Sequence, residues 1–346
     1  MERSLNILIY LVITFITLQS CSSDSKKPDV SGIDLVIKIE RFDQEFAKLD
    51  SQDILSQNRI WQKKYADFYS DYMLHMLQVG SPADTLYMKD ILSKIIKEQD
   101  FKALSQAVNE AFPNLKKQEE ELTLAFKYVK HYFPDYNVPK IISFFSGFMV
   151  QVPVGNDYVG IGLDMFLGSN SPFYPALIQS VPLYISRRFT PENITPRVIE
   201  SVLREELIPE KDMSSNTLQQ MIHHGKIMYS MDCVLDAADS LKIGYTSQQM
   251  EWANQYEGEI WSWFLEEDLL YSNDFQRIQK YFTEAPFTPE LGEHNSSAPK
   301  LGTYIGWQIV KKYMDKHPEL TLIDLLKEEN AQKILEGSKY KGKSSN

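Results

Sequence analysis

The amino-acid sequence predicts an α+β protein that is mostly helical and has one small antiparallel-rich sheet. Three observations lead to this fold class. Residues 33–40 alternate between apolar and polar positions, and stretches with helical spacing follow them. Short β-branched and aromatic runs then occur between residues 141 and 163, after which helical spacing returns as far as residue 317. Strands and helices in separate blocks are typical of α+β domains.

The composition is that of a globular protein. The chain has 346 residues, of which 43% are hydrophobic and 24% are charged, so it can bury a sizeable core. Its formal net charge is −11 at pH 7. An acidic surface repels phosphates, and we therefore expect no nucleic-acid partner.

The N-terminus has the pattern of an exported, lipid-anchored protein. An apolar run over residues 7–18 is too short to span a bilayer but suits a secretory signal, which we place at residues 1–20. Leu18-Gln19-Ser20-Cys21 resembles the lipobox of bacterial lipoproteins, which implies that Cys21 carries acyl chains such as palmitate. Residues 21–32 are then a lipidated flexible tether, and residues 33–340 form a single globular domain.

The first part of the globular domain combines one strand with several helices. Residues 33–40 predict a half-buried strand, and helical spacing begins at residues 41–46. Helical spacing continues over residues 53–115, with a break at Gly80-Ser81-Pro82. Residues 118–133 predict an amphipathic helix whose acidic first turn and basic last turn complement the helix dipole.

The second part begins with the sheet and continues with helices. Residues 141–145, 149–154 and 158–163 predict a three-stranded meander, because glycine, proline and asparagine separate the runs. Helical spacing then predicts helices over residues 174–189, 195–207, 217–236, 247–271 and 301–317. No repeat and no linker after Gly32 divides this domain.

The standard motifs of catalytic sites are absent from the sequence, and we expect neither a metal nor a cofactor. The order of helix, sheet and helix is similar to that of zincin peptidases, so a degenerate zincin-like scaffold is an alternative description of the fold. If Glu200 stood for the zincin general base, the two ligand positions would hold Ile199 and Leu203, which do not bind zinc.

Four residues are candidates for an interaction site or for a structural role: Arg41, Asp164, Glu257 and Trp307. Asp164 lies among apolar neighbours, so it needs partners, and tying a turn or capping a helix is its simplest role. Glu257 is a candidate acid or base, as are Asp164 and Glu200. Trp307 either packs in the core or contributes to an aromatic binding surface.

Several segments in order are similar to the gliding-motility lipoprotein family GldB of the Bacteroidetes. They are the lipobox at Cys21 and residues 37–42, 161–168, 243–246, 258–261, 268–272 and 304–310. The resemblance implies an envelope lipoprotein that is required for gliding over surfaces and works with the machinery that also secretes adhesins. The family implies no established catalytic residues, so none are carried over.

Three hypotheses for the function follow. The first is a non-catalytic binding or assembly component that is anchored by its lipid, faces the periplasm and contacts other envelope motility or secretion proteins. Ser22 and Ser23 are compatible with the outer membrane, which we expect over the inner one. The alternative is an envelope hydrolase, a zincin-like peptidase or a cell-wall hydrolase, with non-standard site residues. The third is a carrier of a small ligand in an aromatic pocket.

Overall fold

The computed structural model describes residues 27–210, 215–289 and 296–343. The chain divides into two compact units, residues 1–32 and residues 33–346. The described part of the first unit contains no helix or strand. The predicted signal peptide, Cys21 and the start of the predicted tether lie outside the described residues. No helix in the described ranges is both long and apolar enough to cross a membrane.

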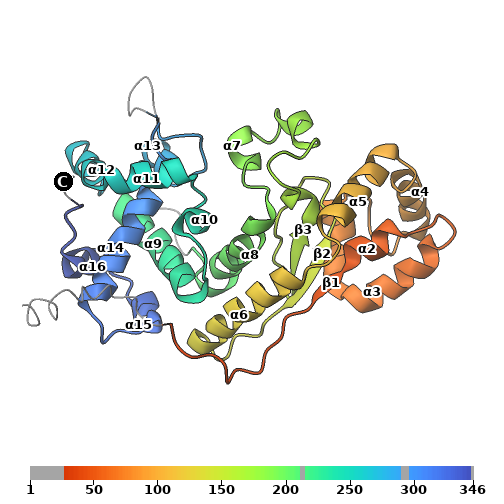
Figure 1. The fold of residues 1–346 in the computed structure, drawn as a ribbon, viewed down its shortest axis with the longest axis horizontal. Coiled ribbons are helices and arrows are strands. Elements are labelled where there is room, and N and C mark those ends of the chain that lie inside the picture. The colour runs from red at the N-terminus through yellow and green to blue at the C-terminus, as the bar shows by residue number, and fades with distance from the viewer. Residues whose placement is uncertain (1–26, 211–214, 290–295, 344–346) are drawn as a thin grey trace, which may run out of the picture. The chain divides into compact units, whose positions relative to one another are not determined.

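The second unit is mostly helical and has one three-stranded sheet, which confirms the predicted α+β class (Figure 1). The strands are β1 (Ile39–Arg41), β2 (Lys140–Phe144) and β3 (Tyr158–Gly162). The α-helices are α2 (Phe42–Ala47), α3 (Ile54–Asp71), α4 (Thr85–Ile95), α5 (Gln99–Ala111), α6 (Lys116–Tyr132), α7 (Leu183–Ser186), α8 (Ile194–Val202), α9 (Thr217–Val234), α10 (Asp239–Ile243), α11 (Ser247–Gln255), α12 (Glu257–Glu266), α13 (Phe275–Ile278), α14 (Leu301–Lys316), α15 (Leu322–Lys327) and α16 (Ala331–Ser338).

The sheet differs from the prediction in the direction of its strands. The strand order is β1-β2-β3, and both neighbouring pairs are parallel, so the prediction of an antiparallel-rich sheet is wrong. The cause is residues 149–154, which we expected as the middle strand. The amides of Gly160 and Gly162 donate to the carbonyls of Pro153 (2.8 Å) and Gln151 (2.9 Å). The segment thus runs antiparallel to β3, but along the edge away from β2, so β2 pairs directly with β3.

The strand β1 is shorter than predicted, and side chains of α6 satisfy part of the backbone at its start. The amide of Ile37 donates to the hydroxyl of Thr123 (2.9 Å), and the amide of Ile39 donates to the carboxylate of Glu119 (3.0 Å). Ile37 precedes β1 and Ile39 is its first residue, so α6 satisfies backbone donors on both sides of the start of the strand. The N-terminal half of the amphipathic helix α6 therefore holds the first residues of the domain in place.

An aromatic cluster fixes the first helices against the sheet. The ring of Phe42 contacts the rings of Trp61, Tyr65 and Tyr72 edge-on, with centroids 5.1, 5.0 and 5.0 Å away. Such pairs contribute roughly 0.5–1.5 kcal/mol each beyond their burial. Because Tyr65 follows Trp61 by about one turn and Tyr72 follows Tyr65 by about two, the helical spacing of the sequence correctly indicates one buried face.

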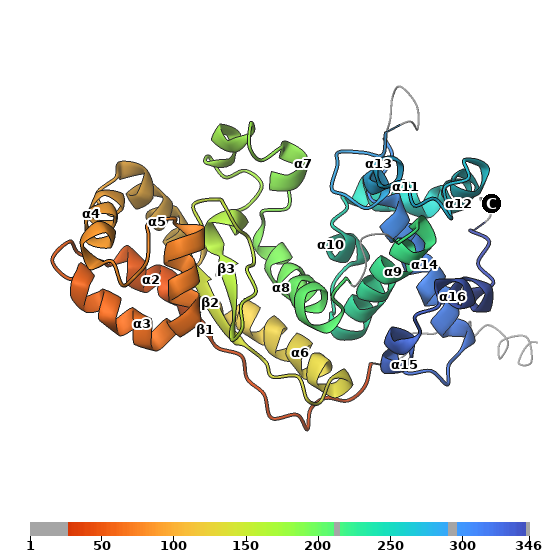
Figure 2. The same cartoon turned by 180° about the vertical axis from the view of Figure 1, so that it is seen from behind.

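The helices α9 and α14 pack with their backbones in contact. A side-chain carbon added at Gly306 of α14 would lie 1.8 Å from the carbonyl oxygen of Met221 in α9. At Gly225 of α9 the same carbon would lie 2.3 Å from the carbonyl oxygen of Gly306. Glycine at both positions is what allows this approach. The short helix α10 lies between α8 and α9 in both views of the fold (Figures 1 and 2).

Two of the predicted helices are interrupted. In place of one helix over residues 174–189 the structure has a 3₁₀ turn, residues 174–177, and the four-residue α7. Pro182 explains the interruption, because proline lacks an N–H and its ring disfavours the interior of a helix. The predicted helix over residues 247–271 divides at Tyr256 into α11 and α12. The helix α11 begins with a capping box formed by Thr246 and Gln249.

Candidate functional site

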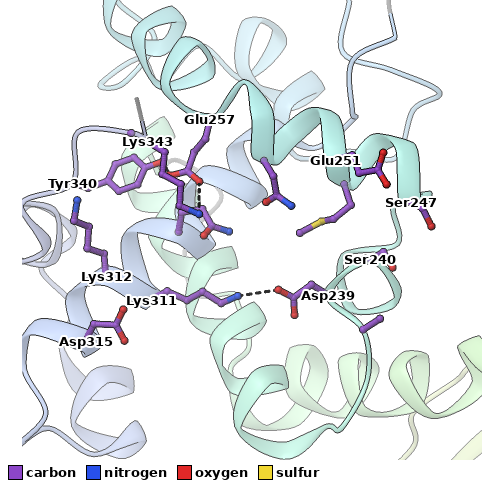
Figure 3. Close-up of a pocket in the computed structure, with 15 residues that line it drawn as sticks. Asp239, Ser240, Ser247, Glu251, Glu257, Lys311, Lys312, Asp315, Tyr340 and Lys343 are labelled. Carbon is purple, nitrogen blue, oxygen red and sulfur yellow. Dashed lines mark hydrogen bonds and ion pairs between the residues drawn. The ribbon is translucent and has the colours of Figure 1, made fainter. Parts of the chain in front are cut away.

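A cavity of about 770 Å³ lies between α10, α11, α14 and the C-terminal segment (Figure 3). Charged and polar side chains form most of its lining. The lining residues are Ala238, Asp239, Ser240, Ser247, Met250, Glu251, Asn254, Glu257, Gln308, Lys311, Lys312, Asp315, Tyr340, Gly342 and Lys343. One sequence-predicted candidate, Glu257, lines the cavity, and a second, Trp307, lies directly under the lining residue Lys311.

Glu257 is a buried carboxylate at the beginning of α12, with only 2% of its surface exposed. It accepts hydrogen bonds from the hydroxyls of Tyr340 (3.0 Å) and Tyr304 (3.3 Å), and the ammonium of Lys343 lies 3.6 Å away. Tyr304 also donates to the side chain of Asn254 (2.9 Å). Burial and, as the second cause, the carboxylate of Glu257 raise the pKa of both tyrosines, so they remain neutral donors.

Trp307 anchors a network of charges at the opposite wall. Its indole N–H donates to the carboxylate of Asp232 (2.7 Å), and the ammonium of Lys311 lies 3.8 Å above its ring. Lys311 also pairs with Asp239 (3.2 Å), and Lys242 bridges Asp232 (2.6 Å) and Asp239 (3.1 Å). Burial would raise the pKa of Asp239, but Lys311 and Lys242 outweigh burial and lower it, so the carboxylate stays ionised at neutral pH.

The cavity is therefore a polar recess in which carboxylates and ammonium groups stand opposite one another. Figure 3 shows Lys311 directed toward Asp239 and Lys343 directed toward Glu257. A charged loop or peptide that enters the recess can bind either member of these ion pairs, because each pair offers both a hydrogen-bond donor and an acceptor. Chemically, the arrangement is suited to recognition of a polar partner.

Arg41, a third sequence-predicted candidate, lies away from the cavity at the end of β1. Its Nε and Nη2 atoms donate to the two carboxylate oxygens of Asp43 (2.9 and 2.7 Å), and Nη2 also donates to the carbonyl of Phe112 (3.0 Å). The hydroxyl of Ser143 in β2 donates to the same carboxylate (2.5 Å). Arg41 thus joins α2, α5 and the sheet.

Asp164 is fully buried just after β3. Its carboxylate accepts hydrogen bonds from the amide and hydroxyl of Ser146 (2.8 and 2.9 Å) and from the amide of Phe148 (2.7 Å). Burial raises the pKa of Asp164, and these hydrogen bonds oppose the shift. The side chain holds the turn after β2 against the end of β3, far in sequence from the residues that line the cavity.

Glu200 of α8 is held between two arginines. Its carboxylate accepts from Arg197 (2.5 Å) and Arg204 (2.9 Å). Burial alone would raise the pKa of Glu200, but the two guanidinium groups hold it well below its usual range. Ile199 and Leu203 are buried, and no group of side chains in the described ranges could hold a metal ion. The zincin-like scaffold stays a prediction.

Sequence reasoning missed several residues that define the cavity. Lys311 is one of them, although it follows Trp307 by one helical turn and can therefore reach over its ring. Tyr340 reaches Glu257 across 83 positions of sequence, and no local pattern indicates that contact. Cys21, the predicted lipid-attachment residue, lies outside the described residues.

Taken together, the fold and the cavity define a mostly helical α+β protein with a charged recess. The model of the family described as gliding motility protein GldB matches residues 23–342 of the chain. The chain belongs to this lipoprotein family, which confirms the resemblance drawn from the sequence. No curated protein and no solved structure matches the chain.

Proposed function

We propose that this chain is a membrane-anchored envelope lipoprotein that serves gliding motility as a non-catalytic binding or assembly component. Membership of the GldB family over residues 23–342 is the observation that carries this proposal. The lipobox at Cys21 supplies the anchor, and acylation holds the protein on a membrane, preferably the outer membrane, with residues 33–340 in the periplasm. Its partners are other envelope proteins of the motility and secretion machinery.

The geometry of the cavity supports a binding role. Its buried carboxylate, Glu257, accepts hydrogen bonds from two neutral tyrosines, and its exposed rim carries acidic residues such as Glu251 and Asp315. Rim charges of this kind steer association and select partners. We therefore assign the docking of an envelope protein to this recess.

Crosslinking in intact cells tests the proposal. The full chain is crosslinked, purified and analysed for envelope proteins by mass spectrometry. We expect the double variant Glu251→Lys, Asp315→Lys to lose its principal partner and the gliding of the cells, because both residues are exposed and only the charge of the rim changes. Glu120→Lys, an exposed charge reversal on α6, is the matched control and should retain both. Recovery of no envelope protein above background from the unmodified chain would argue against a binding role.

The alternative is an envelope hydrolase, and one observation favours it: a buried carboxylate, Glu257, faces a cavity large enough for a ligand. Glu257→Gln separates the two hypotheses, because glutamine keeps the size of the side chain and one acceptor but cannot act as an acid or base. If the chain is a binding component, Glu257→Gln should abolish gliding only where the crosslinked partner is lost as well. Loss of gliding with the partner still crosslinked and the protein at normal abundance would favour the hydrolase.

A further inference from the structure

Arg188 is a buried arginine whose hydrogen bonds are incomplete. It follows α7, is 8% exposed, and lies flat on the backbone at Gly244, where a side-chain carbon would fall 2.1 Å from the guanidinium carbon. Its Nη1 atom donates to Glu284 (2.5 Å). In the part of the chain that the structure describes, its buried Nε and Nη2 atoms have no hydrogen-bond partner. Buried donors without partners are costly and uncommon in folded proteins.

The two unpartnered atoms form one geometrical unit. The N–H groups of Nε and Nη2 lie along the same edge of a guanidinium and point in parallel, which matches two oxygens of one carboxylate or phosphate. Arg41 shows this arrangement filled, because its Nε and Nη2 atoms bind both oxygens of Asp43. The same edge of Arg188 is unfilled and buried.

The surroundings of Arg188 carry an excess of positive charge. Glu284 accepts from both Arg188 and Lys300, the second at 2.7 Å, so it cannot neutralise the two cations fully. Burial lowers the pKa of Lys300 to about 8, with Glu284 opposing this shift and Arg188 adding to it. Burial lowers the pKa of Arg187, and the nearby positive charge of Arg188 lowers it further.

This excess extends toward α8 and α9. The side chains that influence one another electrostatically here are the cations Arg187, Arg188, Arg197, Arg204 and Lys300 and the carboxylates Glu200 and Glu284. His224, which contacts Arg204 at 3.2 Å and stacks on Phe282, is neutral, because burial and then Arg204 lower its pKa. Among the described residues named here, five cations therefore stand against two carboxylates, in a chain whose net charge is −11. A bound anion would offset part of this excess.

We propose that the free edge of Arg188 is a binding site for a small oxyanion, a carboxylate or a phosphate group, held by Nε and Nη2 with Lys300 and Arg187 beside it. Glu284, which accepts from Nη1 on the other side of the guanidinium, has 31% of its side chain exposed. The bidentate bond selects an anion with two oxygens about as far apart as those of a carboxylate, and the surrounding cations stabilise its charge. Chloride has a single centre and cannot offer a separate acceptor to each N–H group, so it should bind more weakly than a two-oxygen anion.

Calorimetry on the full chain in detergent micelles tests this site. The chain is titrated with sodium phosphate and with sodium acetate, in sodium chloride at constant ionic strength. We expect saturable binding with a Kd of about 1 mM or tighter, and competition between the two anions if both bind. Saturation by phosphate alone assigns the site to phosphoryl groups, and saturation by acetate alone assigns it to carboxylates. No saturable heat with either anion overturns the proposal.

Two variants place the binding at Arg188. Arg188→Lys keeps the charge but removes the paired edge, and should weaken the anion roughly tenfold or more. Arg41→Lys, whose edge Asp43 already fills, should leave the affinity unchanged. Equal affinity in Arg188→Lys and in the unmodified chain overturns the proposal. If Arg188→Lys does not fold, Glu284→Gln decides instead: removal of the competing carboxylate should tighten binding several-fold, and an unchanged affinity contradicts the site.

Discussion

Arg41 and Arg188 are two largely buried arginines that differ in how far along the sequence their carboxylate partners lie. Arg41 finds its carboxylate two positions along the chain, in Asp43, and that carboxylate fills the paired edge of the guanidinium. Arg188 finds Glu284 across 96 positions, through the other side of the guanidinium, and its paired edge is left without a partner among the described residues. A locally paired arginine serves the fold. The unfilled edge of Arg188 is where we place the proposed anion.

The largest effect should come from breaking the Arg41 pair. Asp43→Ala leaves a buried guanidinium without its carboxylate and removes the acceptor of Ser143, so we expect the free energy of unfolding to fall by about 3–5 kcal/mol. Urea denaturation measures the change. Asp90→Ala, which breaks the exposed pair with Lys94, is the matched control and should cost less than about 1 kcal/mol. A similar cost in both variants would remove the distinction between a buried and an exposed pair.

A smaller effect should appear as a pH dependence at Lys300. Its pKa in the folded chain is about 8, below the unfolded value of about 10.5, so between these values the unfolded chain binds the extra proton. Stability due to this group therefore rises with pH across that window, by about 1.4 kcal/mol per pH unit. Between pH 7.5 and 9.5 we expect the unmodified chain to gain roughly 2 kcal/mol relative to Lys300→Met.

The control for this titration is Lys89→Met, an exposed lysine whose loss should leave the pH dependence unchanged. Added phosphate sharpens the test. An anion beside Lys300 favours its charged form, raises its pKa and reduces the slope with pH. A slope that is the same in Lys300→Met and in the unmodified chain would show that Lys300 does not titrate in this window.

The smallest effect should come from replacing Arg188 itself. Arg188→Met removes two unpartnered buried donors and leaves Glu284 paired with Lys300, so we expect the free energy of unfolding in chloride to change by no more than about 1 kcal/mol. Arg41→Met, measured in the same way, should cost about 3 kcal/mol, because it strands the carboxylate of Asp43. If Arg188→Met costs as much as Arg41→Met, then Arg188 belongs to the framework of the fold.

Local features of this chain could be predicted from the sequence, whereas contacts between distant segments could not. The aromatic face of α3 and the amphipathic face of α6 repeat at helical intervals, so both helices were found. The direction of β2 and β3 was not found, because it depends on which edge of β3 the intervening segment occupies. No periodic pattern carries that choice.

The same distinction holds for the candidate site. Glu257 could be proposed from its residue type, but its partners Tyr304 and Tyr340 lie 47 and 83 positions away and are brought to it only by the packing of α14 and the C-terminal segment. The bond between Arg41 and Asp43 could have been found from the sequence alone, since the two residues are nearly adjacent. The environment of Arg188 could not, because it draws on α8, α9 and the residues before α14.

The contact between Gly306 and Met221 has a mechanical consequence. Because the backbones of α9 and α14 touch there, sliding either helix along the other would drive a carbonyl oxygen into a peptide unit, so the pair resists shear. Trp307 and Tyr304 at the charged cavity are on α14, and His224 beside the arginine cluster is on α9. A pull on either helix is therefore passed to its partner as a rigid displacement. Two glycines therefore give this chain a contact between α9 and α14 that resists shear.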